Sequence, residues 1–92
     1  MHALQVTVTI QPGHAEEGQE HLEANVVPRA KTAPGFISGY WTRSADGEHG
    51  FSFSVFESEE SARGAADMIP NTPRPDFITF DSIEVQEIVA QT

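Results

Sequence analysis

The chain has 92 residues, with 14 Asp or Glu against 5 Lys or Arg, a formal net charge of −9 at pH 7, and no Cys. This length predicts a single domain over residues 1–92, and the lack of Cys excludes disulfide bonds and thiolate metal sites. The five basic residues are scattered along an acidic chain, which argues against nucleic acid as a partner.

The N-terminal part predicts a strand followed by a helix. Apolar residues alternate with Gln and Thr from Leu4 to Ile10, which is the period of a half-buried strand. From His14 the period changes to that of an amphipathic helix. Its apolar stripe comprises Ala15, Gly18, Leu22, Val26, Ala30 and Ala33. Pro28 lies opposite this stripe and removes a backbone hydrogen bond, so we expect a kink or a break near Val27.

The remaining elements are a hairpin, a second helix and a last strand. Residues 36–43 and 50–56 predict the two strands of the hairpin, because a polar loop with an Asp-Gly turn signal joins them. Ser58 is the expected N-cap of the second helix, which a Pro-rich segment ends. The last strand is predicted over residues 83–89, and residues 77–80 are either its early start or a separate piece.

The order β-α-β-β-α-β predicts a ferredoxin-like α+β fold, in which one antiparallel sheet carries two helices on one face. Alternation places Phe51, Phe53 and Val55 on one face of the third strand and Phe56 on the other. A sheet face with those side chains would be a large exposed apolar patch, which soluble monomers rarely carry. We therefore expect a homodimer in which two sheets pack face to face.

The second strand carries two adjacent aromatic residues, Tyr40 and Trp41. Strict alternation places Phe36 and Tyr40 on one face of the sheet and Ile37 and Trp41 on the other. We expect one of Tyr40 and Trp41 to pack under the helices and the other to lie in the dimer interface.

Two motifs resemble the antibiotic-biosynthesis-monooxygenase family of the dimeric α+β barrel superfamily. Residues 33–36, Ala-Pro-Gly-Phe, resemble the Pro-Gly-Phe turn of that family, and residues 56–62, Phe-Glu-Ser-Glu-Glu-Ser-Ala, resemble its entry to the second helix. The resemblance covers nearly the whole chain and implies a dimeric α+β barrel. The resemblance does not imply one particular activity, because this scaffold hosts cofactor-free quinone-forming monooxygenases, haem-degrading enzymes and isomerases.

The haem-degrading branch of the family carries an Asn in the first strand, a Trp before the second helix and a haem-ligating His in the second helical region. The corresponding positions here hold Val6 and Phe56, and no His follows His49. The resemblance therefore does not extend to haem degradation, and we expect no cofactor.

The cofactor-free branch implies polar and aromatic groups that hold a polycyclic substrate and stabilise its anion toward oxygen. The catalytic candidates of these types are His21, Asn25, Tyr40 and Trp41. The expected ligand pocket comprises Val6, Leu22, Trp41 and Phe56. His21 and Asn25 share a helix face, and a His could act as general base near neutral pH. The alternative is a solvated His among glutamates, and we expect no metal site.

Two functions follow from this pattern. One is a cofactor-free monooxygenase that acts on an aromatic or polyketide-like small molecule. The other is a non-catalytic small-ligand-binding or scaffold homodimer with the same fold. No apolar run is long enough to cross a membrane and no signal sequence is recognisable, so we expect a cytoplasmic protein without a membrane partner.

Overall fold

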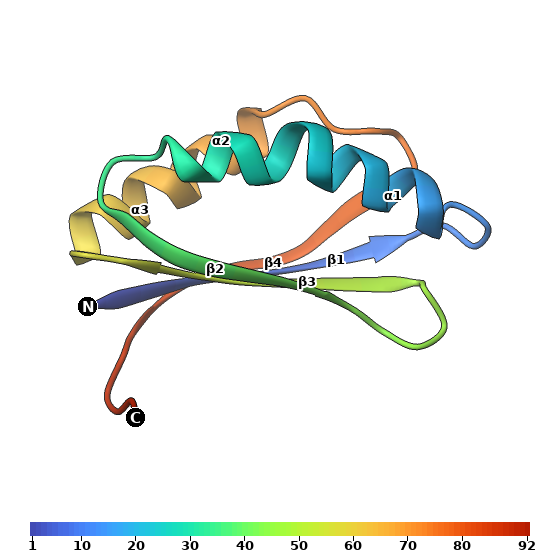
Figure 1. Ribbon diagram of the computed structural model, residues 1–92. Coiled ribbons are helices and arrows are strands. Elements are labelled where there is room, and N and C mark those ends of the chain that lie inside the picture. Colours follow the sequence, from blue (N-terminus) through green and yellow to red (C-terminus); the bar gives the residue numbers. More distant parts are fainter.

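The computed structural model describes all 92 residues, and one face of its sheet carries every helix (Figure 1). The elements in chain order are β1 (His2–Ile10), α1 (Ala15–His21), η1 (Leu22–Val26), α2 (Val27–Lys31), β2 (Phe36–Arg43), β3 (His49–Phe56), α3 (Glu59–Met68), η2 (Ile69–Asn71) and β4 (Ile78–Glu87). The strands are antiparallel neighbours in the order β2-β3-β1-β4. The predicted ferredoxin-like α+β fold is thereby confirmed.

The last strand, β4, both starts and ends earlier in the chain than the predicted strand, residues 83–89. β4 begins at Ile78, so the aromatic segment before Ile83 is the early start of the strand and not a separate piece. It ends at Glu87, which pairs with His2 at the beginning of β1. Ile88 still donates its N–H to the carbonyl oxygen of Met1 at 3.1 Å. Val89 lies beyond this bond in the tail and is 86% exposed, so its predicted place in the strand is wrong.

The segments α1, η1 and α2 follow one another without a gap, and we call residues 15–31 the long helix. Its middle part, η1, is a π-helix, in which each turn is widened by one residue. α2 begins at Val27 and has Pro28 in its first turn, where the missing N–H of a proline costs little. The helix is not interrupted near Val27, because α2 follows η1 without a gap. The irregularity expected from Pro28 takes the form of the π segment that precedes it.

The replacement Pro28→Ala tests whether the π segment already relieves the proline. We expect the free energy of unfolding to change by no more than about 1 kcal/mol, because Ala restores an N–H where the backbone is already helical. Urea unfolding followed by circular dichroism measures this, with the exposed neighbour variant Arg29→Ala as control. A loss well above that range would mean that Pro28 is needed where it lies.

The packed core lies between α3 and the sheet. It is a cluster of Leu4, Val6, Phe56 and Ala62, and the side chain of Ala62 on α3 is completely buried. Ser58 begins α3 as predicted, because its hydroxyl oxygen accepts a hydrogen bond from the N–H of Ser61 at 3.1 Å.

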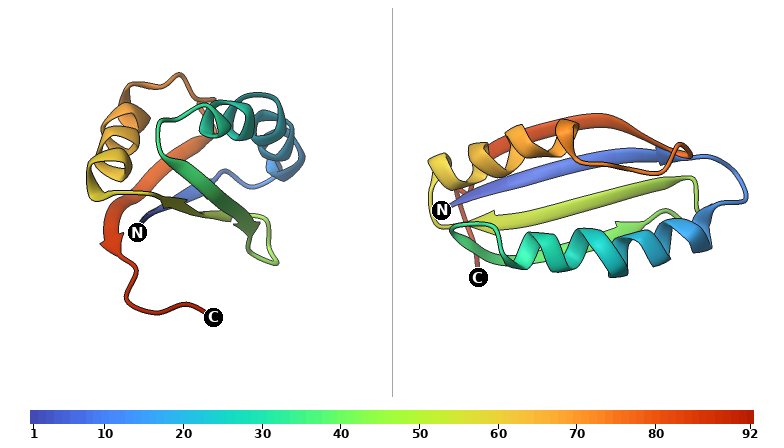
Figure 2. Two further views of the ribbon diagram at one scale, coloured as in Figure 1. Left: turned by 60° about the vertical axis from the view of Figure 1, so that its left-hand side comes forward. Right: turned by 90° about the horizontal axis from the view of Figure 1, so that it is seen from above.

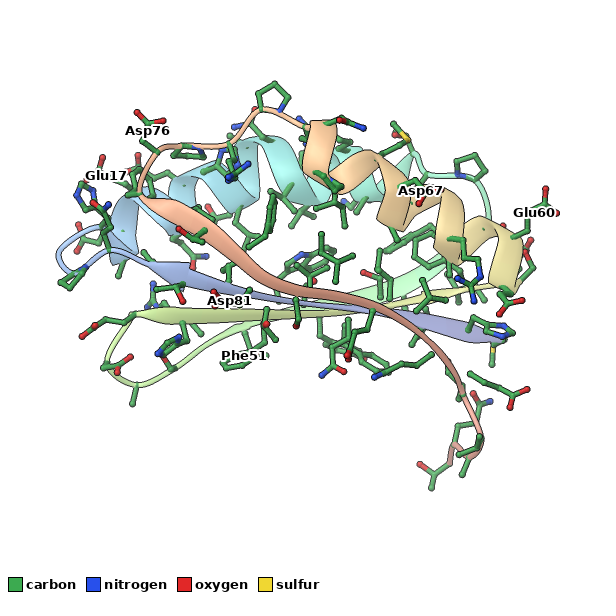
Figure 3. All side chains as sticks on the ribbon, turned by 180° about the vertical axis from the view of Figure 1, so that it is seen from behind. Glu17, Phe51, Glu60, Asp67, Asp76 and Asp81 are labelled. Carbon is green, nitrogen blue, oxygen red and sulfur yellow. The ribbon has the colours of Figure 1, made fainter.

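The other face of the sheet, which we call the open face, carries no helix, and the C-terminal tail leaves the sheet on that side (Figure 1). Phe51 points away from the helices (Figure 3). Phe53 and Tyr40 are paired across β3 and β2 on the same face, and all three side chains are exposed. The β1–β4 half is polar: the hydroxyl groups of Thr7 and Ser82 share a hydrogen bond, and the hydroxyl of Thr9 donates one to the carboxylate of Asp81, both 2.6 Å long. The predicted separation of Phe51 and Phe53 from the buried Phe56 is correct.

The prediction that Phe36 and Tyr40 share a face is wrong. The pairing of β2 with β3 shifts between Phe36 and Ser38, so Ile37 is an extra residue without a partner. A residue inserted in this way reverses the alternation of the side chains. Phe36 therefore packs against the core under the helices, whereas Tyr40 lies on the open face and is 69% exposed.

Candidate functional site

The face of each strand residue follows from its partner across the sheet, because directly opposed residues point to the same side. Val6 on β1 pairs with Ser52 on β3, and Ser52 pairs with Trp41 on β2. Val6 belongs to the core under the helices. Trp41 therefore also faces the helices, and the row Val6–Ser52–Trp41 crosses three strands on that side.

Packing on this side is tight under α3 and loose under the long helix. Seen from above, α3 runs toward the β4 edge of the sheet, and the long helix runs along the β2 edge (Figure 2). No residue of the long helix is buried, although Leu22, Val26 and Val27 form an apolar surface on it. An amphipathic helix normally buries such a surface against its sheet. The long helix therefore packs less closely on the sheet than α3 does.

Small residues explain this loose layer. β3 has Gly50, Ser52 and Ser54 at every second position facing the helices, and Gly39 on β2 pairs with Ser54. Beyond Phe36, β2 contributes two large side chains to this face, Trp41 and Arg43. Trp41 is only partly buried, and Arg43 donates a hydrogen bond to the carbonyl oxygen of Ala15 on α1 at 3.4 Å. The indole of Trp41 is therefore the main aromatic surface under the long helix. We call the layer bounded by Trp41, these small residues and the long helix the candidate site.

His21 and Asn25 are brought together one turn apart on the long helix. The Nδ2 atom of Asn25 lies 3.2 Å from the Nδ1 atom of His21, within hydrogen-bond distance. Partial burial lowers the pKa of His21 below its ordinary value of 6.5, and the positive charge of Arg29 lowers it further. The ring is consequently neutral at neutral pH, which is the form in which a His can accept a proton.

This lowered pKa predicts that acidification destabilises the protein. Below pH 6.5 the His21 ring of the unfolded chain takes up a proton more readily than that of the folded chain, so the free energy of unfolding falls as the pH decreases. The His21→Gln variant should show a flatter dependence in urea unfolding between about pH 5 and pH 7.5. Arg29→Gln, which removes only the second cause, should give an intermediate slope. Parallel slopes for the wild type and His21→Gln would contradict this assignment.

The other predicted site residues lie in different places. Val6 and Phe56 are 7% and 2% exposed within the core under α3. Leu22 is half-buried on the long helix. Tyr40 lies on the open face, so it is separated from Trp41 by the sheet and does not contribute to the candidate site.

The sequence interpretation missed the small residues of the candidate site. The sequence pattern assigned no role to Gly39, Gly50, Ser52 and Ser54. Their signal is nevertheless present, since small residues recur at every second position of β3. Phe36, which was predicted to share a face with Tyr40, packs on the helix-covered side instead, where the rings of Phe36 and Phe56 meet edge to face at a centroid distance of 5.8 Å.

An open groove between α3 and β4 is lined by Arg63, Ala66, Asp67, Pro70, Ile83 and Val85. No group of three or more His, Asp or Glu side chains converges in an arrangement that could hold a metal ion. No helix is both long and apolar enough to cross a membrane.

The chain can be compared with known proteins by its sequence and by its β-α-β-β-α-β fold. The sequence of residues 1–67 matches the family described as antibiotic biosynthesis monooxygenase. The chain belongs to this family. The match covers β1 through nearly all of α3, so both motifs that suggested the resemblance lie within it. A search of curated protein sequences finds no match.

Solved structures with the same fold come from several bacteria. The haem degrader MhuD from Mycobacterium tuberculosis, with two haems in its active site, is 22% identical with a TM-score of 0.70, and 98% of each chain is covered. The monooxygenase ActVA-Orf6 of Streptomyces coelicolor, in complex with nanaomycin D, is 16% identical with a TM-score of 0.60, covering 99% of this chain and 91% of that one. A dimeric ferredoxin-like protein from an uncultured marine organism is 11% identical, with a TM-score of 0.68 and coverage of 100% and 98%. At these identities the likeness establishes the fold.

Proposed function

We propose that the protein is a cofactor-free monooxygenase that binds a planar aromatic or polyketide-like small molecule between the long helix and β2–β3. The observation that carries this proposal is the partly exposed indole of Trp41 on the helix-covered face, beneath a helix with no buried residue. Flat apolar walls with a few polar groups are the usual lining of sites for such molecules. The family supports the same class, and its member ActVA-Orf6 holds nanaomycin D.

The proposed reaction converts an activated ring CH₂ group and O₂ into C=O and H₂O. The substrate supplies the electrons, so the protein has to bind it, remove a proton and exclude water. We assign proton removal to His21, because its ring is neutral at neutral pH. The side-chain amide of Asn25 lies 3.2 Å from Nδ1 of this ring, and when the amide oxygen is turned to accept a hydrogen bond from Nδ1–H, the Nε2 atom is free to take the proton. Deprotonation makes the substrate an electron-rich anion that can react with oxygen.

A hydroxylated anthrone, with oxygen uptake and quinone absorbance as readouts, tests this function. We expect Trp41→Leu to lower kcat/KM about tenfold or more, because the aromatic wall is lost. Tyr40→Phe is the matched control, since its side chain lies on the opposite face, and it should retain full activity. His21→Gln should lower kcat with little change in substrate binding. Wild-type oxygen uptake equal to the protein-free rate would contradict the proposal.

A non-catalytic small-ligand-binding or scaffold homodimer is the second candidate. It is favoured by the surroundings of His21, whose side-chain partner is an amide and not the carboxylate that commonly orients a catalytic His. Binding of the probe without oxygen uptake above the protein-free rate would establish the ligand-binding function.

We further propose that the single-domain chain acts as a homodimer in the cytoplasm, with a second copy covering the open face. The exposed Phe51, Phe53 and Tyr40 side chains support this assembly, since uncovered aromatic groups on one sheet face are unfavourable in water. The fold is also similar to that of a dimeric ferredoxin-like protein. Native mass spectrometry of the purified protein tests the assembly, and any additional non-covalent mass would identify a ligand.

A further inference from the structure

We propose that Gly39 is a positioning residue that determines the thickness of ligand the candidate site accepts, by letting the indole of Trp41 lie back along β2. This inference rests on the proposed function, because it concerns the planar ligand that would occupy the layer under the long helix. Gly39 and Trp41 are two residues apart on the same strand, so they point to the same side of the sheet.

The contacts around Gly39 show why a side chain is excluded there. A Cβ atom at this position would lie 2.9 Å from the Cη2 atom and 3.1 Å from the Cζ3 atom of Trp41, closer than such atoms normally approach. The same Cβ atom would lie 3.3 Å from the Cζ atom of Phe36. The benzene half of the indole thus covers the backbone of Gly39, and the ring of Phe36 also borders this position.

The direction in which the indole would move follows from these neighbours. Phe36 blocks movement along the strand, because its ring already borders the position and packs against Phe56. The backbone of β2 lies below. A methyl group at Gly39 would therefore push the free end of the indole up, toward the long helix. That movement fills the layer that we assign to the ligand.

This arrangement matches one chemical class of ligand. With the indole lying back, the space above it is bounded by a ring surface, by Ser52 and Ser54 of β3, and by the apolar surface of the long helix. A flat fused-ring molecule can stack in such a layer, whereas a bulky globular molecule cannot. Because Gly39 has no methyl group, the indole leaves the full height of the layer open to a flat ligand.

The variants Gly39→Ala and Gly64→Ala form a matched pair for the test. Gly64 lies exposed on α3, and a Cβ atom there would meet nothing within 4 Å. Trp41 is the sole Trp of the chain, so fluorescence emission and the near-ultraviolet circular dichroism of indole report its surroundings directly. We expect Gly39→Ala to change both spectra and Gly64→Ala to leave them as in the wild type.

Ligand affinity is measured by calorimetric titration with 1,8-dihydroxyanthraquinone, a flat, uncharged probe of three fused rings. We expect Gly39→Ala to weaken binding about tenfold or more, as for a methyl group placed in a closely fitting apolar site, and Gly64→Ala to bind as the wild type does. In a Trp41→Leu background the same Gly39→Ala change should have little effect, because the clashing ring is gone. If Gly39→Ala alone does not fold, the double variant still tests the inference, because it lacks the clashing ring.

The outcomes separate this inference from the proposed function. If the wild type binds the probe and Gly39→Ala binds it within twofold of the same affinity, the role of Gly39 is wrong and the proposed site stands. An equal loss of affinity in the Trp41→Leu background would also overturn the inference, because Gly39 would then act independently of the indole. If the wild type fails to bind planar probes at all, both the proposed function and the inference are wrong.

Discussion

Replacing Phe53 by Glu is expected to convert a species of twice the 10.0 kDa chain mass into a monomer of 10.0 kDa or into insoluble protein. Phe53 lies in the middle of β3 on the open face, between Gln5 of β1 and Tyr40 of β2, and its side chain is exposed in the single chain. If a second sheet covers this face, the substitution buries a carboxylate without a partner. The chain is already acidic, so repulsion between the two copies adds to that penalty.

Met68→Glu is the matched control for this experiment. Met68 is also an exposed apolar residue, but it ends α3 on the helix-covered side of the molecule. Met68→Glu adds the same charge as Phe53→Glu, and we expect this variant to show the wild-type dimer mass in native mass spectrometry. A Phe53→Glu protein that keeps the wild-type dimer mass would show that another surface joins the two copies.

Replacing Phe56 by Ala is expected to lower the free energy of unfolding by about 3–5 kcal/mol. Phe56 ends β3 within the core, where its ring contacts the edge of Phe36 and the cluster that includes Leu4 and Ala62. The truncation leaves a cavity that these neighbours fill only partly. Because small domains are stable by only about 5–15 kcal/mol, this loss could leave much of the protein unfolded.

Urea unfolding of Phe56→Ala measures this loss, with two controls. Phe56→Leu retains most of the buried volume and should cost clearly less. Phe51→Ala removes the same ring from the open face, so it tests whether loss of any β3 phenylalanine has the same effect. At protein concentrations where the chain is monomeric, we expect Phe51→Ala to remain close to the wild type. A loss below about 1 kcal/mol for Phe56→Ala would place its ring outside the essential core.

Much of the fold is predictable from local chemistry. The alternation from Leu4 to Ile10, the hydroxyl of Ser58 and the proline at position 28 each act within a few residues of the backbone. A strand period, an N-cap and a missing N–H have the same consequence in almost any surroundings. For this reason, the order of the elements, the beginning of α3 and an irregular helix just before Pro28 agree with the structure.

The candidate site depends on contacts between strands, which the sequence does not encode locally. The extra residue Ile37 changes the face of Phe36 relative to Tyr40, and nothing in the segment 36–43 marks it as a bulge. Likewise, the sequence leaves open which of Tyr40 and Trp41 lies under the helices. The pairing of Trp41 with Ser52 decides this, because it sets one register for the whole strand.

The sequence by itself determined the family, the element order and the two candidate groups on the long helix, His21 and Asn25, since turn motifs and helical spacing are properties of short segments. Only the tertiary structure decided that Trp41 lies over Gly39 beneath a loosely packed helix. That arrangement depends on the alignment of three strands and on the height of a helix above them. Both are set by the packing of residues far apart in the chain.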